Sequence, residues 1–505
     1  MWCVMSKSYS DFMNEITDKK LYESLIKYGM FSEKLPAIFD LEDFYSYCIN
    51  KGDSFTNKWY SYISFESIRN VNVPRLISIP TPMAHEKLCR CLSDCWSDLQ
   101  KYFQNMTSDN KYVVSRIHLR KMKGEKSLFA MNYKSWRIDG TPETDLMIGK
   151  KYVVCVDISK CFPSIYTHPI PWALVGKDIA KNNKRDKSLW YNKIDTCAQY
   201  SKNGETHGIM IGPHTSNVLS EIILCAIDKN LTKHWDYIRN IDDYCCYVNN
   251  IEETEQFLID INRELRFYGL ALNHKKTEIL EIPFGTIEKW VSQLNDKSIY
   301  FQKFHPYVDY REVQAYLNYC VLLMDRNKGN ASIILYGLKV LNSFNLTDNA
   351  KKFLEKTLVS YALIYPYIVP LLDEYVFEYC ETDKENVTKY VNCIYDKYLE
   401  KNYFEACSYS LYYAIRHDVI IKNFNVDIVI QKKDCILLLL AWIYSKKCKD
   451  SNSLDKLKDL AKKLKDKEMD EYWIFIYECL TVGFLKEEWR KLKQANISFL
   501  SKEYQ

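Results

Sequence analysis

Two adjacent carboxylates, Asp242 and Asp243, are the side chains of this sequence best suited to catalysis. Apolar and β-prone residues flank the pair on both sides, a pattern that predicts the tight tip of a β-hairpin. Adjacent carboxylates at a rigid turn repel each other unless a cation lies between them, and an all-oxygen ligand set favours Mg²⁺. Most Asp-Asp pairs are solvated turn residues, so a metal site needs support from elsewhere in the sequence.

A third carboxylate, Asp157, follows the apolar strand expected over residues 152–156 and can complete a three-carboxylate site. Two Mg²⁺ ions held about 4 Å apart by such a site, with Mn²⁺ as a substitute, would activate a 3′-hydroxyl and stabilise a leaving pyrophosphate. Between the carboxylates, residues 207–217 form a glycine-bearing loop that opens a helix. Such a loop lets the backbone approach a nucleotide closely.

The elements that must position these residues belong to a large chain. Its 505 residues, 47% of them hydrophobic, predict two to four structural units. Only 14 Gly and 13 Pro leave little room for long linkers, so we expect the units to pack together. The net charge of +4 is mild, which permits a local basic face for nucleic acid without requiring one.

Cysteine usage and hydropathy bear on the compartment. The 18 Cys are scattered without paired CxxC units, so reduced thiols are expected, and the cluster Cys89, Cys91 and Cys95 is expected to pack rather than to bind zinc. The N-terminal segment is too short for a signal h-region. The longest apolar run, residues 435–444, is half of what a membrane span needs and predicts a buried helix. We therefore expect a soluble intracellular protein without a membrane partner.

Strand and helix patterns predict an α+β region followed by an all-α region. Residues 1–70 look mostly helical. Residues 71–150 contain a proline-punctuated segment, an amphipathic helix near 87–103 and a basic, strand-like stretch at 112–123. Residues 151–300 alternate strands with helices, which is an α+β pattern.

After about residue 300 the strands largely disappear. Helical patterns follow at spacings of roughly 20 residues, and a two-helix unit of roughly 40 residues fits a HEAT-like α-solenoid. An irregular helical bundle is the alternative. The expected helices cover residues 311–324, 331–344, 350–363, 387–399, 404–416, 434–446 and 454–465. The lysine-rich segment 446–467 predicts a solvated helix face rather than a nucleic-acid patch.

Four segments resemble the motifs of reverse transcriptases, in the same order and within about 120 residues. Asp157, with Phe162 five positions later, resembles motif A, and residues 211–217 resemble motif B. Residues 241–244 resemble the motif C hairpin, and residues 270–277 are similar to motif D. The resemblance implies the fingers and palm of a right-hand polymerase.

More narrowly, residues 163–168, 171–174 and 212–221 are similar to the abortive-infection group of bacterial defence reverse transcriptases, which includes the "unknown group" defence enzymes. Members carry a helical-repeat region where other reverse transcriptases have a thumb. In the C-terminal region the resemblance extends only to the succession of helices and not to specific motifs. It implies an N-terminal helical extension, fingers, a palm with motifs A to D, and a helical-repeat domain; the corresponding residues are 1–70, 71–150, 151–300 and 301–505.

The resemblance also implies residue roles. Asp157, Asp242 and Asp243 would be catalytic metal ligands. Lys276 would approach the β- and γ-phosphates or protonate the leaving pyrophosphate; a plain surface lysine is the alternative. Phe162 would be a steric gate that fills the space of a ribose 2′-hydroxyl and so favours dNTPs; ordinary core packing is the alternative.

Other residues are expected near the nucleotide. Arg116 and Arg120 are candidates for gripping the triphosphate from the fingers, because a guanidinium can pair with phosphate oxygens bidentately; a salt-bridge role is the alternative, and Arg75 is a weaker candidate. The remaining expected nucleotide-binding residues are Ile158, Ile211, Gly212 and Ser216.

One departure from the family pattern concerns the template. Ile211 stands where many templated reverse transcriptases place Gln, and an Ile side chain cannot hydrogen-bond near the incoming nucleotide. Abortive-infection relatives share this kind of change, and several are thought to extend DNA without an external template, sometimes from a protein tyrosine. The 40 Tyr of this chain do not identify a primer, and tyrosine enrichment more often reflects packing.

The sequence thus predicts a Mg²⁺-dependent DNA polymerase of antiphage defence in the bacterial cytoplasm, which adds dNTPs to a 3′-hydroxyl or a tyrosine primer without an ordinary template. An RNA-templated enzyme that copies a dedicated non-coding RNA is one alternative. A catalytically silent scaffold that partners another polymerase is a second, and a mobile-element polymerase is favoured less. The expected partners are dNTPs, the DNA product, a non-coding RNA, and a second copy of the chain or a second reverse transcriptase.

Overall fold

The computed structural model describes residues 7–52, 55–68, 74–121, 140–283, 289–304 and 307–505. The chain forms two compact units, and both are assembled from separate stretches of sequence. The first unit consists of Met1–Ser32, Asp40–Ile63 and Ser78–Thr286, and the second of Glu33–Phe39, Ser64–Ile77 and Ile287–Gln505. The α+β pattern and the later helical pattern therefore fall largely into different units.

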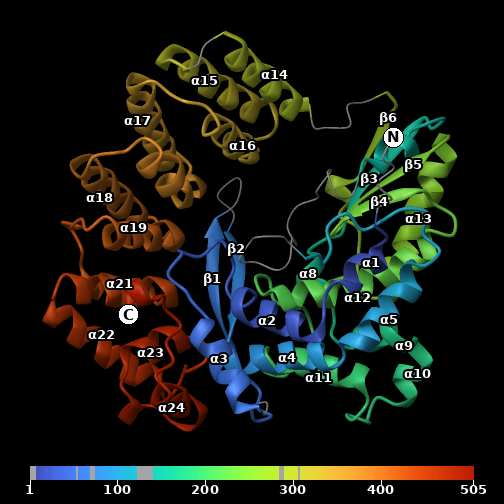
Figure 1. The fold of residues 1–505 in the computed structure, drawn as a ribbon, viewed down its shortest axis with the longest axis horizontal. Coiled ribbons are helices and arrows are strands. Elements are labelled where there is room, and N and C mark those ends of the chain that lie inside the picture. The colour runs from blue at the N-terminus through green and yellow to red at the C-terminus, as the bar shows by residue number, and fades with distance from the viewer. Residues whose placement is uncertain (1–6, 53–54, 69–73, 122–139, 284–288, 305–306) are drawn as a thin grey trace. The chain divides into compact units, whose positions relative to one another are not determined.

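The first unit contains a four-stranded antiparallel sheet with the order β4-β5-β3-β6 (Figure 1). The strands are β3 (Tyr152–Asp157), β4 (Tyr237–Asn240), β5 (Asp243–Val248) and β6 (Glu278–Glu281). Val, Tyr and Cys dominate the two central strands, and such residues pack well on a half-buried pleated surface. The long helices α12 (His214–Leu231) and α13 (Ile251–Phe267) contact each other, and α13 contacts β3 and β5.

The other helices of this unit pack mainly against one another. They are α1 (Tyr9–Asn14), α2 (Asp18–Tyr28), α3 (Glu42–Lys51), α4 (Pro82–Asp94), α5 (Trp96–Thr107), α7 (Pro142–Leu146), α8 (Cys161–Ser164), α9 (Pro169–Val175), α10 (Lys177–Asn182) and α11 (Trp190–Tyr200). Helix α2 packs against α4, and α4 packs against α11. The single helix expected near 87–103 is two helices, α4 and α5, that meet at Cys95. Pro82 starts the first of them, where its missing N–H costs nothing.

The basic stretch expected to be strand-like forms no regular strand within its described part, residues 112–121. It runs beside β4 through one parallel bridge, Ser115 with Arg239. The Arg116 N–H donates to the Arg239 carbonyl at 2.7 Å, and the Arg239 N–H donates to the Val114 carbonyl at 2.8 Å. The pairing with β4 extends over one bridge only, which does not make a strand, so the prediction of a strand in this stretch was wrong for its described residues.

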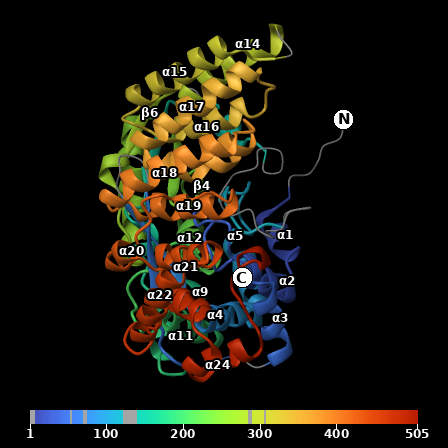
Figure 2. The same ribbon diagram turned by 90° about the vertical axis from the view of Figure 1, so that its left-hand side faces the viewer.

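The second unit is mainly helical. Its helices are α14 (Lys289–Phe304), α15 (Tyr310–Arg326), α16 (Ser332–Leu341), α17 (Asp348–Ile364), α18 (Lys384–Glu400), α19 (Phe404–Arg416), α20 (Val426–Lys432), α21 (Cys435–Lys447), α22 (Ser451–Leu464), α23 (Trp473–Cys479) and α24 (Glu487–Gln494). Helices close in sequence contact each other, as α15 does with α16, α18 with α19 and α21 with α22 (Figure 2). A regular HEAT-like repeat stays a prediction.

Short N-terminal segments complete this unit. Strands β1 (Tyr62–Ile68) and β2 (Pro74–Pro80) pair with each other, and most of both strands belongs to this unit through the stretch Ser64–Ile77. The Ser67 hydroxyl donates to the carboxyl of Glu405 on α19 at 2.7 Å. Phe39 bridges Leu500 near the end of the chain. Interpreting residues 1–70 as one helical extension misses strand β1, and it also misses the contacts of Ser67 with Glu405 and of Phe39 with Leu500, because these join residues hundreds of positions apart.

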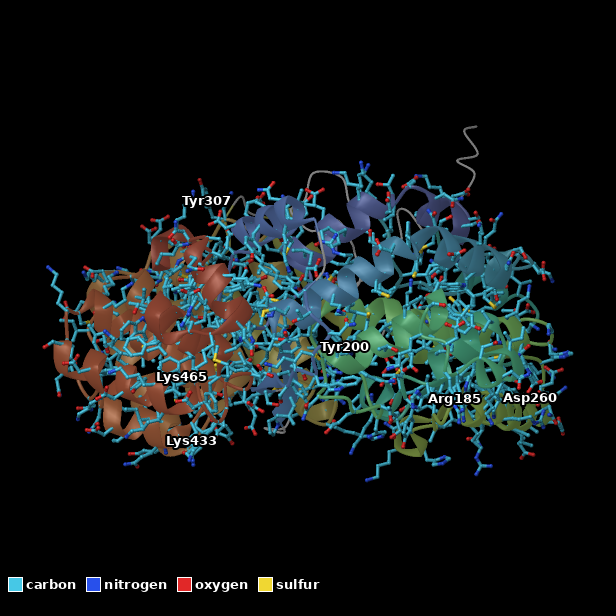
Figure 3. All side chains as sticks on the ribbon, turned by 90° about the horizontal axis from the view of Figure 1, so that it is seen from below. Arg185, Tyr200, Asp260, Tyr307, Lys433 and Lys465 are labelled. Carbon is cyan, nitrogen blue, oxygen red and sulfur yellow. The ribbon has the colours of Figure 1, made fainter. Side chains whose placement is uncertain are left out.

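Two features of the second unit match the sequence analysis. Helix α21 is buried around most of its circumference, as its apolar run predicted. The lysine-rich helix α22 pairs its lysines with aspartates, including Lys456 with Asp427 and Lys462 with Asp459, and Lys465 just beyond it is labelled in Figure 3. Among the described residues, no helix is both long enough and apolar enough to cross a membrane.

Candidate active site

The strands β4 and β5 form the predicted hairpin, whose loop consists of Ile241 and Asp242 between the paired residues Asn240 and Asp243. Ile241 has a φ of +57°. That conformation suits the first loop position of a primed hairpin turn, which normally takes Gly, and it costs a β-branched residue of order 1–3 kcal/mol. The hairpin tip is therefore a strained point that its surroundings must hold.

The register of the sheet places the third carboxylate beside this tip. Asp157 ends β3 and lies opposite Asp243 on β5. The Ile158 N–H donates to the Asp242 carbonyl at 3.1 Å, so residues 158 and 242 form a hydrogen-bonded pair and the neighbouring pair of Asp157 with Asp243 is a narrow one. Side chains approach most closely in narrow pairs. The strand register thus brings together two carboxylates, Asp157 and Asp243, that lie 86 residues apart in the sequence.

One carboxylate oxygen from each of Asp157, Asp242 and Asp243 lies within 4.8 Å of the others. In the described part of the chain, these three form the only such group of metal-ligating side chains. Three carboxylates are a hard oxygen donor set, which fits Mg²⁺ or Mn²⁺ and does not suit a thiophilic metal. The predicted convergence of the three residues is present.

Burial and mutual repulsion govern the charge of this cluster. Desolvation, followed by the charges of Asp242 and Asp157, raises the pKa of Asp243 to about 7, and the Lys276 ammonium opposes that rise. A carboxyl that resists ionisation beside two others marks a site where a bound cation would relieve repulsion.

The motif D segment contacts Asp157 directly. The Asn273 side-chain amide donates to Asp157 Oδ2 at 2.8 Å, and Lys276 Nζ lies 3.1 Å from Asp157 Oδ1. The Asn273 N–H also donates to the Asp157 carbonyl at 2.8 Å. The sequence analysis assigned no role to Asn273; the only available signal was its place in motif D. The structure shows that it orients Asp157.

The turn that carries Phe162 packs against the loop before α12. Phe162 is half-buried at the start of α8, and Ile158 is fully buried. The Ile209 N–H donates to the Phe162 carbonyl at 2.9 Å. Gly208 makes this approach feasible, because a Cβ there would lie 2.8 Å from the Pro163 carbonyl oxygen, and its φ is +81°.

The motif B loop leads into α12. Ile211 and Gly212 are partly exposed, whereas Ser216 is buried and lines a small cavity with His85. The Ser78 N–H donates to the Ile211 carbonyl at 2.7 Å. Ile211 and Gly212 are therefore accessible from outside, whereas Ser216 is not.

The two candidate fingers arginines lie inside the first unit. Arg116 and Arg120 are each about 1% exposed. Arg116 donates to the Gly140 carbonyl at 2.7 Å, and Arg120 donates to the Arg116 carbonyl at 3.3 Å. These hydrogen bonds to backbone carbonyls hold both side chains inside the unit. A triphosphate could reach these guanidinium groups only after the segment moves.

An antiparallel sheet that carries three carboxylates at the end of its central strands and in the adjoining hairpin loop can hold divalent metal ions for nucleotidyl transfer. Residues 83–318 match the family model described as "Reverse transcriptase (RNA-dependent DNA polymerase)". The chain therefore contains a reverse transcriptase domain. Motifs A to D lie within the matched residues.

Solved structures of yeast telomerases show weak similarity. Apo telomerase from Candida tropicalis truncated from its C-terminal domain is 14% identical, with 48% of this chain and 55% of that chain covered and a TM-score of 0.28. The apo telomerase of the same organism is 13% identical, with coverages of 91% and 76% and a TM-score of 0.32. Candida albicans telomerase in complex with a fragment of telomeric RNA is 11% identical, with coverages of 81% and 73% and a TM-score of 0.28.

The chain thus spans about half the length of the first of these telomerases. No curated protein matches the chain.

Proposed function

We propose that this protein is a divalent-metal-dependent DNA polymerase whose metal ligands are Asp157, Asp242 and Asp243. The observation that carries the proposal is the convergence of the three carboxylates within 4.8 Å, inside a reverse transcriptase domain. Two Mg²⁺ ions, or Mn²⁺ in their place, would activate the attacking hydroxyl and stabilise the leaving pyrophosphate. The hydroxyl attacks the α-phosphate of a dNTP, a phosphodiester bond forms, and the bond to pyrophosphate breaks.

The other site residues act around that reaction. Lys276 is exposed beside Asp157, from where its ammonium can donate a proton to the leaving pyrophosphate. Phe162 acts as the steric gate against a 2′-hydroxyl, above the buried Ile158. Ile211 and Gly212 contact the nucleotide, and Ser216 supports them. Arg116 and Arg120 contact the triphosphate in a state in which their segment has opened.

We further propose the narrower role of a bacterial, cytoplasmic antiphage-defence enzyme. It would extend a 3′-hydroxyl or a tyrosine primer without an ordinary template. Support comes from the motif resemblance and from Ile211, whose side chain offers no hydrogen bond to a templating base. In this proposal the fingers, palm and helical-repeat region follow the expected domains, and the working form is an oligomer or a complex with a second reverse transcriptase.

The second candidate function is copying of a dedicated non-coding RNA. The family match favours it, because the matched model describes an RNA-dependent enzyme. A catalytically silent scaffold is the third candidate, and the complete carboxylate triad argues against it.

A polymerase assay with a sequenced product tests these alternatives. The double variant Asp242→Ala, Asp243→Ala should lose dNTP incorporation, whereas the exposed-aspartate control Asp178→Ala, Asp186→Ala should retain it. Incorporation by the first variant would refute the metal mechanism. A low-complexity product that persists after RNA removal supports untemplated synthesis; a defined sequence that disappears with the RNA supports the second candidate.

A further inference from the structure

Arg239 is a completely buried cation on β4, two residues before the hairpin loop. Its Nε donates to Asp228 Oδ2 at 2.9 Å, and its Nη1 donates to Glu221 Oε2 at 3.0 Å. Both carboxylates belong to α12 and are seven residues apart, so two helical turns place them on one face. The guanidinium is thereby fixed to the helix.

The same guanidinium also holds the hairpin tip. Arg239 Nη1 donates to the Ile241 carbonyl at 3.0 Å. Ile241 carries the positive φ and immediately precedes Asp242, so this charge-assisted bond fixes the peptide that orients the first metal ligand of the hairpin. The next carbonyl, that of Asp242, accepts from the N–H of Ile158, the residue directly after β3. Both loop carbonyls are therefore held, one by α12 through Arg239 and one by the residue that follows β3.

The remaining polar atoms of this network have partners too. The Tyr237 hydroxyl donates to Asp228 Oδ1 at 2.8 Å, and the Tyr9 hydroxyl donates to Glu221 Oε1 at 2.9 Å. A buried polar network that is well hydrogen-bonded specifies one arrangement of its members. Its geometry is consequently rigid enough to position a neighbouring site.

Helix α12 connects two parts of the catalytic centre. It begins at His214, two residues after Gly212, and it carries Glu221 and Asp228 further along. The loop that approaches the nucleotide and the hairpin that carries Asp242 and Asp243 are thus attached to one rigid element. Two side chains of β4 attach the hairpin to this helix, Tyr237 through Asp228 and Arg239 through both carboxylates, and Arg239 also donates to the loop carbonyl of Ile241.

We propose that Arg239 is a positioning residue that sets the metal-binding geometry of Asp242 and Asp243 by holding the Ile241 carbonyl against α12. This inference rests on the proposed function for the role of the carboxylates. It assigns Arg239 no contact with substrate or metal. Partners that orient metal ligands typically contribute 10- to 100-fold to metal affinity.

The test is a set of variants whose first readouts need no activity. In Arg239→Lys, an ammonium can pair with the carboxylates of α12 but cannot span both of them and the Ile241 carbonyl. We expect Mn²⁺ affinity, measured from the electron paramagnetic resonance signal of free Mn²⁺, to fall about 10- to 100-fold. Hydrogen exchange at the hairpin should accelerate, and kcat should fall while the KM for dNTP changes little.

A second variant covers the case in which Arg239→Lys does not fold. The triple variant Arg239→Met, Glu221→Gln, Asp228→Asn removes all three buried charges together, so none is left unpaired. It should fold and show the same loss of Mn²⁺ affinity. Arg90→Lys is the matched control, because Arg90 pairs with Glu86 and donates to the Cys48 carbonyl elsewhere in the same unit.

A rescue variant shows whether the loss of Mn²⁺ affinity in Arg239→Lys arises from the hairpin loop or from helix α12. Adding Ile241→Gly to Arg239→Lys should recover Mn²⁺ affinity, because Gly adopts a positive φ without strain. Folded Arg239 variants with wild-type affinity and hairpin exchange would overturn the proposal, as would a loss that Ile241→Gly does not recover. Failure of the proposed function would appear separately, as dNTP incorporation by the Asp242→Ala, Asp243→Ala variant.

Discussion

Lys276 Nζ lies 3.1 Å from Oδ1 of Asp157, so this lysine pairs with a carboxylate of the three-carboxylate cluster and remains largely exposed. The pair places a mobile ammonium at the edge of the carboxylate cluster. Binding of a cation to Asp157 would weaken this pairing, because both positive charges compete for the same carboxylate. Lys276 can then turn toward the phosphates, where its proton is needed.

Replacement of Lys276 tests this role. Lys276→Ala should lower the rate of nucleotide addition about 100-fold or more, since general acid catalysis typically contributes 10²–10⁴-fold. Lys276→Arg keeps the charge beside Asp157 but cannot release a proton near neutral pH, so its rate should stay low. Single-turnover incorporation measures both, with the neighbouring exposed Lys275→Ala as the control. Full activity of Lys276→Arg would show that only the charge matters.

Substitution at Gly208 tests the close contact between the backbone of Gly208 and the Pro163 carbonyl, because a control glycine with a similar φ measures the backbone strain alone. Gly208→Ala combines a φ of +81° with a Cβ only 2.8 Å from the Pro163 carbonyl oxygen. Gly149→Ala has a similar φ of +77° in open space. We expect the control to lose about 1–2 kcal/mol of unfolding free energy and Gly208→Ala to lose more, along with dNTP incorporation. If urea unfolding shows that Gly208→Ala and Gly149→Ala lose the same free energy of unfolding, the backbone of residue 208 does not pack against Pro163 in the Phe162 turn.

Disulfide trapping can verify the strand register. Cys155 and Cys245 lie directly opposite each other on β3 and β5, with their Sγ atoms 3.2 Å apart. They belong to a narrow pair, whose Cα separation of about 4.5 Å falls within the range of disulfides. An added disulfide oxidant such as diamide should therefore link them, as peptide mass spectrometry would detect. Cys155→Ser should abolish the link and Cys448→Ser should not; failure of the wild-type chain to form it would argue against the register.

The buried Glu405 should make the stability of the second unit pH-dependent. Burial raises its pKa to about 7, against an ordinary value of 4.5. Between these pH values the folded state holds more protons than the unfolded state, so stability falls as pH rises through this window, by about 3 kcal/mol at most. Urea unfolding of the full chain at about pH 5 and about pH 8 should show the decrease.

Glu405→Gln should remove that dependence. The Ser67 hydroxyl, which donates to the carboxyl at 2.7 Å, can rotate and accept from the new amide instead. The exposed Glu400→Gln serves as the control and should retain the wild-type profile. An unchanged slope in Glu405→Gln would show that another group titrates.

Local patterns in the sequence predicted much of the palm. The hairpin around Asp242 and Asp243, the strand that ends in Asp157 and the two long helices follow from residue types a few positions apart. The order of the motifs indicated the polymerase class, and the family match supports it. These features depend on short-range periodicity and turn chemistry, which a sequence displays directly.

Short-range patterns do not reveal which residues contact each other when they lie far apart in the sequence. The stretch around Arg116 and Arg120 has the composition of a basic, exposed strand, yet both side chains are buried and the backbone makes one bridge to β4. Glu405 has no local signal for its bond to Ser67, which lies 338 positions away. Burial and partners at such separations depend on which surfaces meet after folding.

By itself, the sequence determined which residues can bind a metal, in what order they occur and on which local elements they lie. Only the tertiary structure decided that Asp157 faces Asp243, that Asn273 and Lys276 contact Asp157, and that Arg239 joins the hairpin to α12. The physical reason is that side-chain identity and periodicity act over a few residues. A catalytic geometry instead requires a strand register and buried hydrogen bonds between segments that the chain keeps far apart.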